Sequence, residues 1–174
     1  MAHWNGWKWV LFILIGLVVL PACRGGEQAD NGELQVGDFD YAAGNRDFQV
    51  ALNGVVLQVN DVEVLAGDVD IGSGYLYVVP RINVTNNGEN PVGATEFSLV
   101  DEYLNQYQSW QTSVSFAETL AGMPAVINRG EAVAGDHVFI VPAAALQANL
   151  KVRWESSDYR SRIEISLGNL AVAP

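Results

Sequence analysis

Cysteine is almost absent from this chain of 174 residues, which contains only Cys23. One thiol excludes a disulfide framework, a Cys-x-x-Cys redox pair and a thiolate zinc site within a single chain. Histidine is also scarce, since His137 is the only one beyond residue 22. With one imidazole and at most one thiol there, the chain lacks the usual ligands of a transition metal.

Positive charge is scarce as well: nine Lys and Arg residues stand against 20 Asp and Glu, for a net charge of −11. Nucleic acid is therefore excluded as a partner, because binding its phosphates needs clustered Lys and Arg. Residues 23–174 also lack a sustained helical period, which leaves strands as the main elements. That length suits one domain with its own core rather than two.

What the chain does have is an apolar beginning, residues 1–22, with the sequence MAHWNGWKWVLFILIGLVVLPA. Lys8 is its only basic side chain other than histidine, and the stretch from Trp9 to Leu20 is apolar apart from one glycine. Twelve residues of helix span about 18 Å, well short of the roughly 30 Å hydrocarbon core of a bilayer. A short basic start, an apolar helix and small residues at its end predict a secretory signal peptide.

The signal peptide ends in Leu20-Pro21-Ala22-Cys23, which resembles the bacterial lipobox. Pro21 departs from the small or hydroxyl residue that the family usually has there. The resemblance implies a diacylglyceryl group on the Cys23 sulfur and further acylation, such as palmitate, at the new amino terminus. Two or three acyl chains hold a protein stably, so we expect a lipoprotein at the extracytoplasmic face of a bacterial membrane. The alternatives are an uncleaved single-pass anchor, or a chance cysteine after a conventional signal.

Residues 23–45 are predicted to be a flexible tether that follows the lipidated cysteine. They are rich in Gly, Asp, Glu, Asn and Ala, and such a stretch buries too little apolar surface to offset the entropy of ordering. Phe39 and Tyr41 are the residues of this stretch that could dock on the domain.

From residue 46 apolar residues alternate with polar ones, which predicts seven or eight short strands in residues 46–174. Asn53-Gly54 predicts a tight hairpin, and a change of parity predicts a bulge near Asn60-Asp61. Pro80 cannot donate to a ladder, so we expect it at an edge-facing or bulged position. The fold class predicted is all-β, an antiparallel immunoglobulin-like β-sandwich held by packing alone.

Three stretches, residues 77–88, 97–101 and 128–142, contain a strand that ends in Asn-Asn-Gly, a Phe-x-Leu-x-Asp strand, and a Gly-Glu turn before Phe-Ile-Val-Pro. Together they resemble a family of secreted and lipid-anchored bacterial domains of unknown function. The fold of that family is similar to that of the immunoprotective extracellular antigens, an immunoglobulin-like sandwich. The resemblance brings no catalytic residues, and its motif positions are expected to shape turns and core.

Catalysis is not predicted, because no nucleophile and base stand in a recognisable arrangement. Ser73 lies in Gly-Ser-Gly, which is not the nucleophile elbow of hydrolases. His137 is expected to be a solvent-facing strand residue. An enzyme is therefore the less favoured function class.

Four acids, Asp61, Glu63, Asp68 and Asp70, fall within ten residues and suggest a second alternative. Carboxylates and loop carbonyls can supply the six to eight oxygens that Ca²⁺ prefers. The loop from Asp68 lacks the bidentate Glu of a calcium loop, because its twelfth position is Val79. Solvated acids and a Ca²⁺-dependent structural domain both remain open, and no other cofactor is predicted.

Four aromatic residues are candidate contacts for a partner: Tyr75, Tyr77, Tyr107 and Trp110. They form either an exposed binding patch or a strip that loops cover. The function predicted is a non-catalytic binding or scaffolding module for an unknown protein or cell-envelope partner. It would act by surface complementarity or strand addition, while the lipid raises its local concentration at the membrane.

Overall fold

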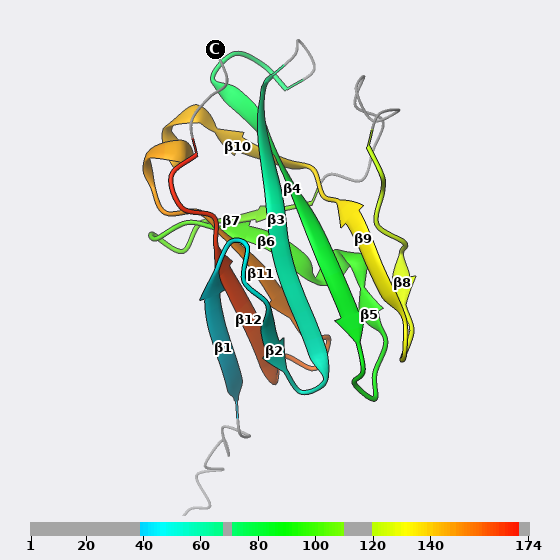
Figure 1. The fold of residues 1–174 in the computed structure, drawn as a ribbon. Helices are drawn as coiled ribbons and strands as arrows, with labels where there is room; N and C mark the ends of the chain where they lie inside the picture. Colours follow the sequence, from blue (N-terminus) through cyan, green and yellow to red (C-terminus); the bar gives the residue numbers. More distant parts are fainter. Residues whose placement is uncertain (1–38, 68–70, 110–119, 171–174) are drawn as a thin grey trace, which may run out of the picture. The chain divides into compact units, whose positions relative to one another are not determined.

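The computed structural model describes residues 39–67, 71–109 and 120–170, all within the unit Gly37–Pro174. Two main sheets pack face to face in it (Figure 1). The first sheet has the order β1 (Asp40–Asn45), β12 (Ser161–Ser166), β11 (Lys151–Glu155), β6 (Phe97–Val100) and β7 (Gln106–Gln108). The second has the order β10 (Phe139–Pro142), β4 (Tyr75–Asn86), β3 (Val55–Ala66) and β2 (Val50–Leu52), and β9 (Ala132–Asp136) also pairs with β4.

The remaining elements are short. A two-stranded sheet joins β5 (Val92–Gly93) to β8 (Val126–Ile127), and the 3₁₀ helices are η1 (Ala94–Glu96) and η3 (Ala143–Gln147). No helix in the described residues is long and apolar enough to cross a membrane. The predicted β-sandwich is thereby confirmed, although the described part of the chain divides it into twelve strands rather than seven or eight.

The core lies between the two sheets and is built by alternation along each strand. In β6 and β11, Phe97, Leu99, Val152 and Trp154 point inward and are at most 4 % exposed. Facing them from the second sheet are Leu57, Val59, Ile82, Val84 and Phe139, all nearly inaccessible to solvent. Burying a large apolar side chain contributes about 1.5–3 kcal/mol, so packing of this kind replaces the disulfide that the chain lacks.

The local predictions for β2 and β3 are confirmed. Asn53 and Gly54 have φ angles of 48° and 84°, as a type I′ hairpin turn requires at both central positions. The register between β3 and β4 shifts between Val59 and Asp61, which is the predicted bulge.

Pro80 is expected at an edge-facing or bulged position. It lies in β4, a central strand, so the edge strand is wrong, but the ladder on one side of β4 is interrupted at this residue. Pro80 faces the gap between β10 and β9, which pair with the same edge of β4, β10 with the residues before Pro80 and β9 with the residues after it. The backbone N–H of His137 donates to the Pro80 carbonyl at 3.1 Å. The missing N–H of proline is tolerated there because no regular ladder bond is required of it.

The sandwich begins earlier than predicted, since residues 40–45 form β1 and are not part of a tether. β1 pairs with β12 in a parallel register from Asp40↔Ser161 to Asn45↔Ser166, so the first sheet is not wholly antiparallel. Ala42 packs against the core, which explains why this glycine- and acid-rich stretch is ordered. The chain then crosses to the second sheet, where Asp47 N–H donates to the Val59 carbonyl.

Two positions of the family motifs hold turns, as expected. Asn86 is fully buried, and its side chain bonds three backbone groups, those of Gly88, Asn90 and Ile127. Asp101 is 4 % exposed and accepts four hydrogen bonds within the turn between β6 and β7. Both residues therefore act on structure rather than on a ligand.

Candidate binding site

A polar hollow of about 440 Å³ lies at one end of the sandwich, and we call it the end hollow. Three turns meet there: the β2–β3 hairpin, the turn after β4 and the turn between β11 and β12. Its lining residues are Asp40, Asn53, Val55, Gly88, Glu89, Asn90, Pro91, Val92, Glu96, Trp154, Ser156, Ser157, Asp158, Arg160 and Ser161. The sequence predicts these turns but not their convergence.

Hydrogen bonds fix several of the polar side chains that line the end hollow. The Asn53 side-chain amide donates to Asp40 Oδ2 at 2.7 Å and to Ser161 Oγ at 2.9 Å, which ties the hairpin to β1 and β12. On the other side, Asp158 Oδ1 accepts from Ser156 Oγ at 2.6 Å and from the Arg160 N–H at 3.1 Å. These bonds lower the pKa of Asp158. The hollow is therefore preorganised.

Glu96 and Trp154 form the inner wall of the end hollow. The indole N–H of Trp154 donates to Glu96 Oε2 at 2.8 Å. Burial raises the pKa of the Glu96 carboxyl, and the bond from Trp154 only partly opposes that shift. A half-buried carboxylate on this wall can accept hydrogen bonds or attract a positive group.

A groove of about 350 Å³ lies beside the end hollow and shares Glu96, Ser156 and Ser157 with it. It follows the outer face of the first sheet and is also lined by Thr95, Phe97, Ser98, Gln106, Gln108, Glu155 and Tyr159. Of its polar members, Ser98, Gln106, Gln108 and Glu155 occupy the strand positions that alternate with the inward core residues of β6, β7 and β11.

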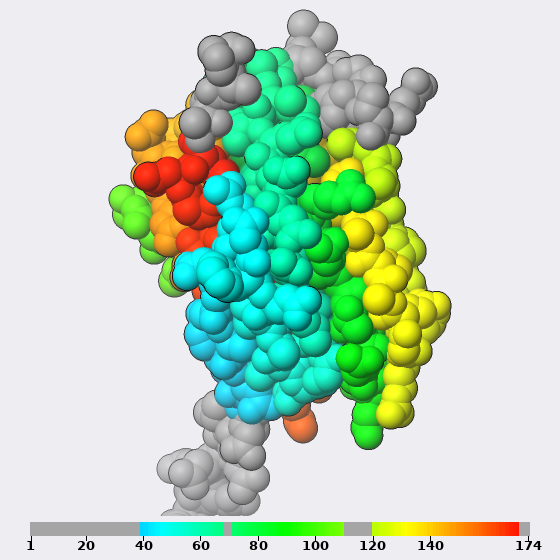
Figure 2. All heavy atoms as spheres, in the orientation of Figure 1, coloured from blue at the N-terminus to red at the C-terminus, as the bar shows by residue number. Residues whose placement is uncertain are grey.

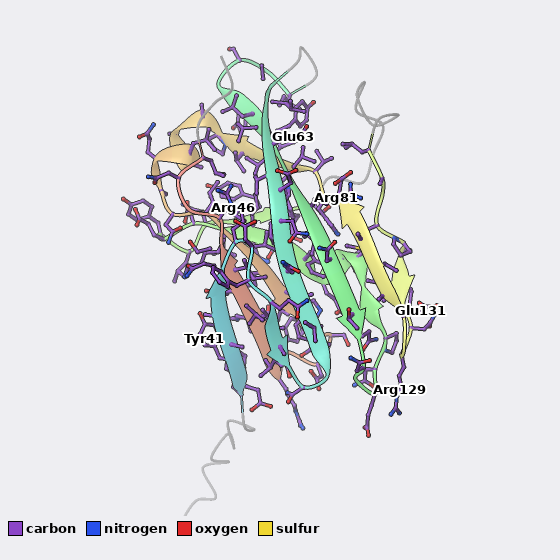
Figure 3. All side chains as sticks on the ribbon, in the orientation of Figure 1. Tyr41, Arg46, Glu63, Arg81, Arg129 and Glu131 are labelled. Atoms are coloured by element: carbon purple, nitrogen blue, oxygen red, sulfur yellow. The ribbon has the colours of Figure 1, made fainter. Side chains whose placement is uncertain are left out.

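Farther along the same outer face, an ion network surrounds the buried carboxylate of Glu164. Arg153 Nη2 lies 2.6 Å from Glu164 Oε1, and Lys151 Nζ lies 3.1 Å from Oε2. The Tyr41 hydroxyl donates to Oε2 at 3.1 Å, and Figure 3 shows Tyr41 at β1. Burial alone would raise the pKa of Glu164, but the bonds from Arg153 and Lys151 outweigh it and lower the pKa. These bonds hold the side chains of Tyr41, Lys151 and Arg153 in place on the outer face of the first sheet.

The end hollow is acidic. Asp40, Glu89, Glu96 and Asp158 line it against one basic residue, Arg160. Negative charge in a concave site attracts cationic groups and repels phosphates and other anions. The arrangement suits a polar ligand that is neutral or positively charged.

Among the described residues, the candidate groups for catalysis do not form a working site. His137 is 3 % exposed, so the prediction that it faces solvent is wrong. Its Nδ1 lies 3.2 Å from Ser109 Oγ, and its ring packs between Phe97 and Phe139 with centroids 5.0 and 6.0 Å away. Its Nε2 is buried and has no partner in the described part of the chain, so no carboxylate there orients the ring as a hydrolytic triad requires.

Asp61 and Glu63, the two calcium candidates that the structure describes, lie on the outer face of the second sheet, the face that Figure 2 presents. Asp61 and Glu63 share a hollow of about 240 Å³ with Arg81 and Asp136. Arg81 lies 3.5 Å from Asp136, and Figure 3 labels it on β4 beside Glu63 on β3. In the part of the chain that the structure describes, no group of three or more His, Cys, Asp or Glu residues is placed to hold a metal. Asp68 and Asp70 lie outside that part, so the calcium hypothesis stays a prediction.

The structure does not gather the candidate aromatic residues on one surface. Tyr75 is 45 % exposed, whereas Tyr77 is 1 % exposed and packs with Val79 and Val138 in a small second core. Tyr107 belongs to the other sheet, where its hydroxyl donates to Asp101 Oδ2 at 3.1 Å. Of the two arrangements expected, an exposed patch or a covered strip, Tyr77 therefore adopts the covered one. Trp110 lies outside the described residues, as does Cys23.

Solved structures with this fold include a candidate lipoprotein (ycdA) of Bacillus subtilis, 12 % identical, with a TM-score of 0.52. That match covers 70 % of this chain and 38 % of the other, so the chain spans well under half the length of that protein. The yjhA protein of Bacillus subtilis is 13 % identical and matches with a TM-score of 0.50, over 71 % of this chain and 98 % of its own.

A secreted protein of Mycobacterium tuberculosis, MPT63, is 13 % identical and has a TM-score of 0.48, over 75 % of this chain and 99 % of its own. No family model and no curated protein matches the sequence. At these identities the matches show the fold alone. The chain is a β-sandwich protein.

Proposed function

We propose that this chain is a bacterial lipoprotein, held by Cys23 at the extracytoplasmic face of a membrane, whose sandwich is a non-catalytic binding module. The lipobox-like sequence and the apolar stretch before it support the anchor. The similarity in fold to a candidate lipoprotein agrees with that location.

The end hollow is the observation that carries the binding role. It is concave, preorganised and acidic, and its lining contains no histidine, cysteine or lysine. The partner that it suits is a component of the cell envelope that presents an amine or another positively charged group, because four carboxylates face one guanidinium there.

Metabolic labelling with an alkyne analogue of palmitate tests the anchor. The wild-type chain is expected to incorporate the label, and Cys23→Ser to incorporate none, because the chain has no other cysteine and its lipidation is expected to start at this sulfur. Mass spectrometry of the mature amino-terminal peptide should show a diacylglyceryl thioether. Label retained by Cys23→Ser, or a Cys23 thiol that reacts with maleimide, would refute the anchor.

Titration followed by nuclear magnetic resonance tests the end hollow, with a short oligolysine peptide and polyphosphate as probes. Oligolysine should shift the amide resonances of Asn90, Ser157 and Arg160, and polyphosphate should leave them in place. Glu89→Lys should weaken oligolysine binding at least fivefold.

The matched control is Glu63→Lys, which makes the same change of charge on the second sheet and should alter affinity less than twofold. Equal effects of the two substitutions would show attraction by net charge alone, and a polyphosphate response at the same residues would contradict the proposed selectivity.

A further inference from the structure

The turn between β6 and β7 exposes two adjacent apolar side chains, and we call it the β6–β7 tip (Asp101–Asn105). Tyr103 is 74 % exposed and Leu104 is 76 % exposed. No other two neighbours in the described sequence are both large, apolar and exposed. Figure 1 shows this turn projecting from the side of the sandwich. Single exposed apolar residues are ordinary, but an adjacent pair on a projecting turn is a feature of contact sites.

The β6–β7 tip is rigid because a buried carboxylate organises it. Asp101 Oδ1 accepts from the backbone N–H groups of Tyr103 and Asn105 at 2.9 and 2.8 Å. Oδ2 accepts from the Asn105 side chain at 2.7 Å and from the Tyr107 hydroxyl at 3.1 Å. The two apolar side chains are therefore presented in one fixed backbone conformation.

Leu104 adopts a backbone conformation that its side chain disfavours. Its φ angle is +67°, in the left-handed region where glycine and asparagine are normally found. A leucine at such a position is costly, and here burial offsets little of that cost because the residue is 76 % exposed. A strained residue that does not stabilise its own fold points to a function outside it.

We propose that the β6–β7 tip docks into an apolar pocket of a partner protein, with Tyr103 and Leu104 as the anchoring side chains. Tyrosine is enriched among residues that dominate binding energy, and a preorganised turn loses little entropy on docking. The adjacent Glu102 and the acidic chain disfavour insertion into an anionic lipid surface, so the partner is a protein with a neutral or basic rim. This inference needs neither the lipid at Cys23 nor the end hollow.

Site-specific photocrosslinking in intact native cells tests the proposal on the full chain. Benzoylphenylalanine replaces Tyr103 in one variant and Phe48, a solitary aromatic that is 68 % exposed, in the control. Position 103 should give a discrete adduct of protein mass that position 48 does not give. An adduct of lipid mass, equal adducts from both positions, or no adduct would overturn the proposal.

Leu104→Gly separates docking from structure. It removes the anchoring side chain and relieves the left-handed strain, but glycine also raises the entropy of the unfolded chain. The melting midpoint should therefore stay within about 1–2 °C of the wild-type value or rise. Introduced beside benzoylphenylalanine at position 103, it should reduce the protein adduct at least fivefold. A midpoint lowered by more than about 4 °C would assign Leu104 to the stability of the fold. An undiminished adduct would show that Leu104 does not contact the partner.

Discussion

Replacing Asn86 with alanine is expected to lower the free energy of unfolding by about 3 kcal/mol. The side chain is fully buried at the end of β4. Its amide donates to the carbonyl of Ile127 at 3.0 Å and to that of Asn90 at 2.9 Å, while its oxygen accepts from the Gly88 N–H at 3.0 Å. Alanine would leave these backbone groups without partners, and an unsatisfied buried group costs about 1–3 kcal/mol.

Asn87→Ala is the matched control for this substitution. Asn87 is the next residue of the same Asn-Asn-Gly motif, but it is exposed, so its loss should change stability by less than about 0.5 kcal/mol. Urea unfolding of the sandwich domain measures both values. Equal effects at the two positions would show that the motif acts through the backbone propensity of asparagine and not through the buried side chain.

Signals that depend on neighbouring residues were readable from the sequence. The Asn53-Gly54 hairpin and the bulge after Val59 follow from local turn chemistry and from side-chain parity, and both are confirmed. The inward positions of β6 and β11 follow from alternation in the same way. These features need no knowledge of distant parts of the chain.

Features that depend on distant partners were not readable. β1 is ordered by parallel pairing with β12, which lies some 120 residues farther along the chain, and its Gly, Ala and Asp composition conceals this. Alternation predicts a solvent-facing His137, but the break between β9 and β10 interrupts the alternation, so His137, Val138 and Phe139 are all buried.

The same limit applies to the candidate site. The sequence predicts turns near residues 53–54, 86–91 and 156–160, but it does not show that they surround one hollow. Residue type and strand parity place Tyr75 and Tyr77 on one face of a strand, but they do not distinguish the buried Tyr77 from the exposed Tyr75. The location of a pocket is a property of the packed turns, so it becomes visible only in three dimensions.

Acidification from pH 6.5 to pH 4 is expected to destabilise the sandwich domain by about 3 kcal/mol through His137 alone. Burial lowers the pKa of this imidazole to about 4, and the nearby charge of Asp136 only partly opposes the shift. In the unfolded chain the pKa is about 6.5. Because the unfolded state takes up the proton first, the stabilisation is complete above pH 6.5 and is lost as the pH falls toward 4.

The structure explains why the folded state resists this proton. Protonation would place a charge between Phe97 and Phe139 and make both ring nitrogens donors, although Nε2 has no partner among the described residues. The ring also lies at the seam where Ser109 bridges to Phe139 and joins the edges of the two sheets. Opening of this seam is the expected first consequence of acid.

Urea unfolding at a series of pH values, with His137→Asn as the control, measures the effect. Asparagine can keep a hydrogen bond to Ser109 but does not titrate, so the unfolding free energy of this variant should not fall between pH 7 and pH 5, whereas that of the wild type declines. Asp101 and Glu164 also have lowered pKa values, yet their contributions disappear only as the pH falls below about 4.5. Glu96, whose pKa burial raises, takes up its proton first in the folded state, and this opposes the decline to the same extent in both proteins. The difference between the two proteins from pH 6.5 to 4.5 therefore isolates the histidine, and an equal decline in both there would show that another group is responsible.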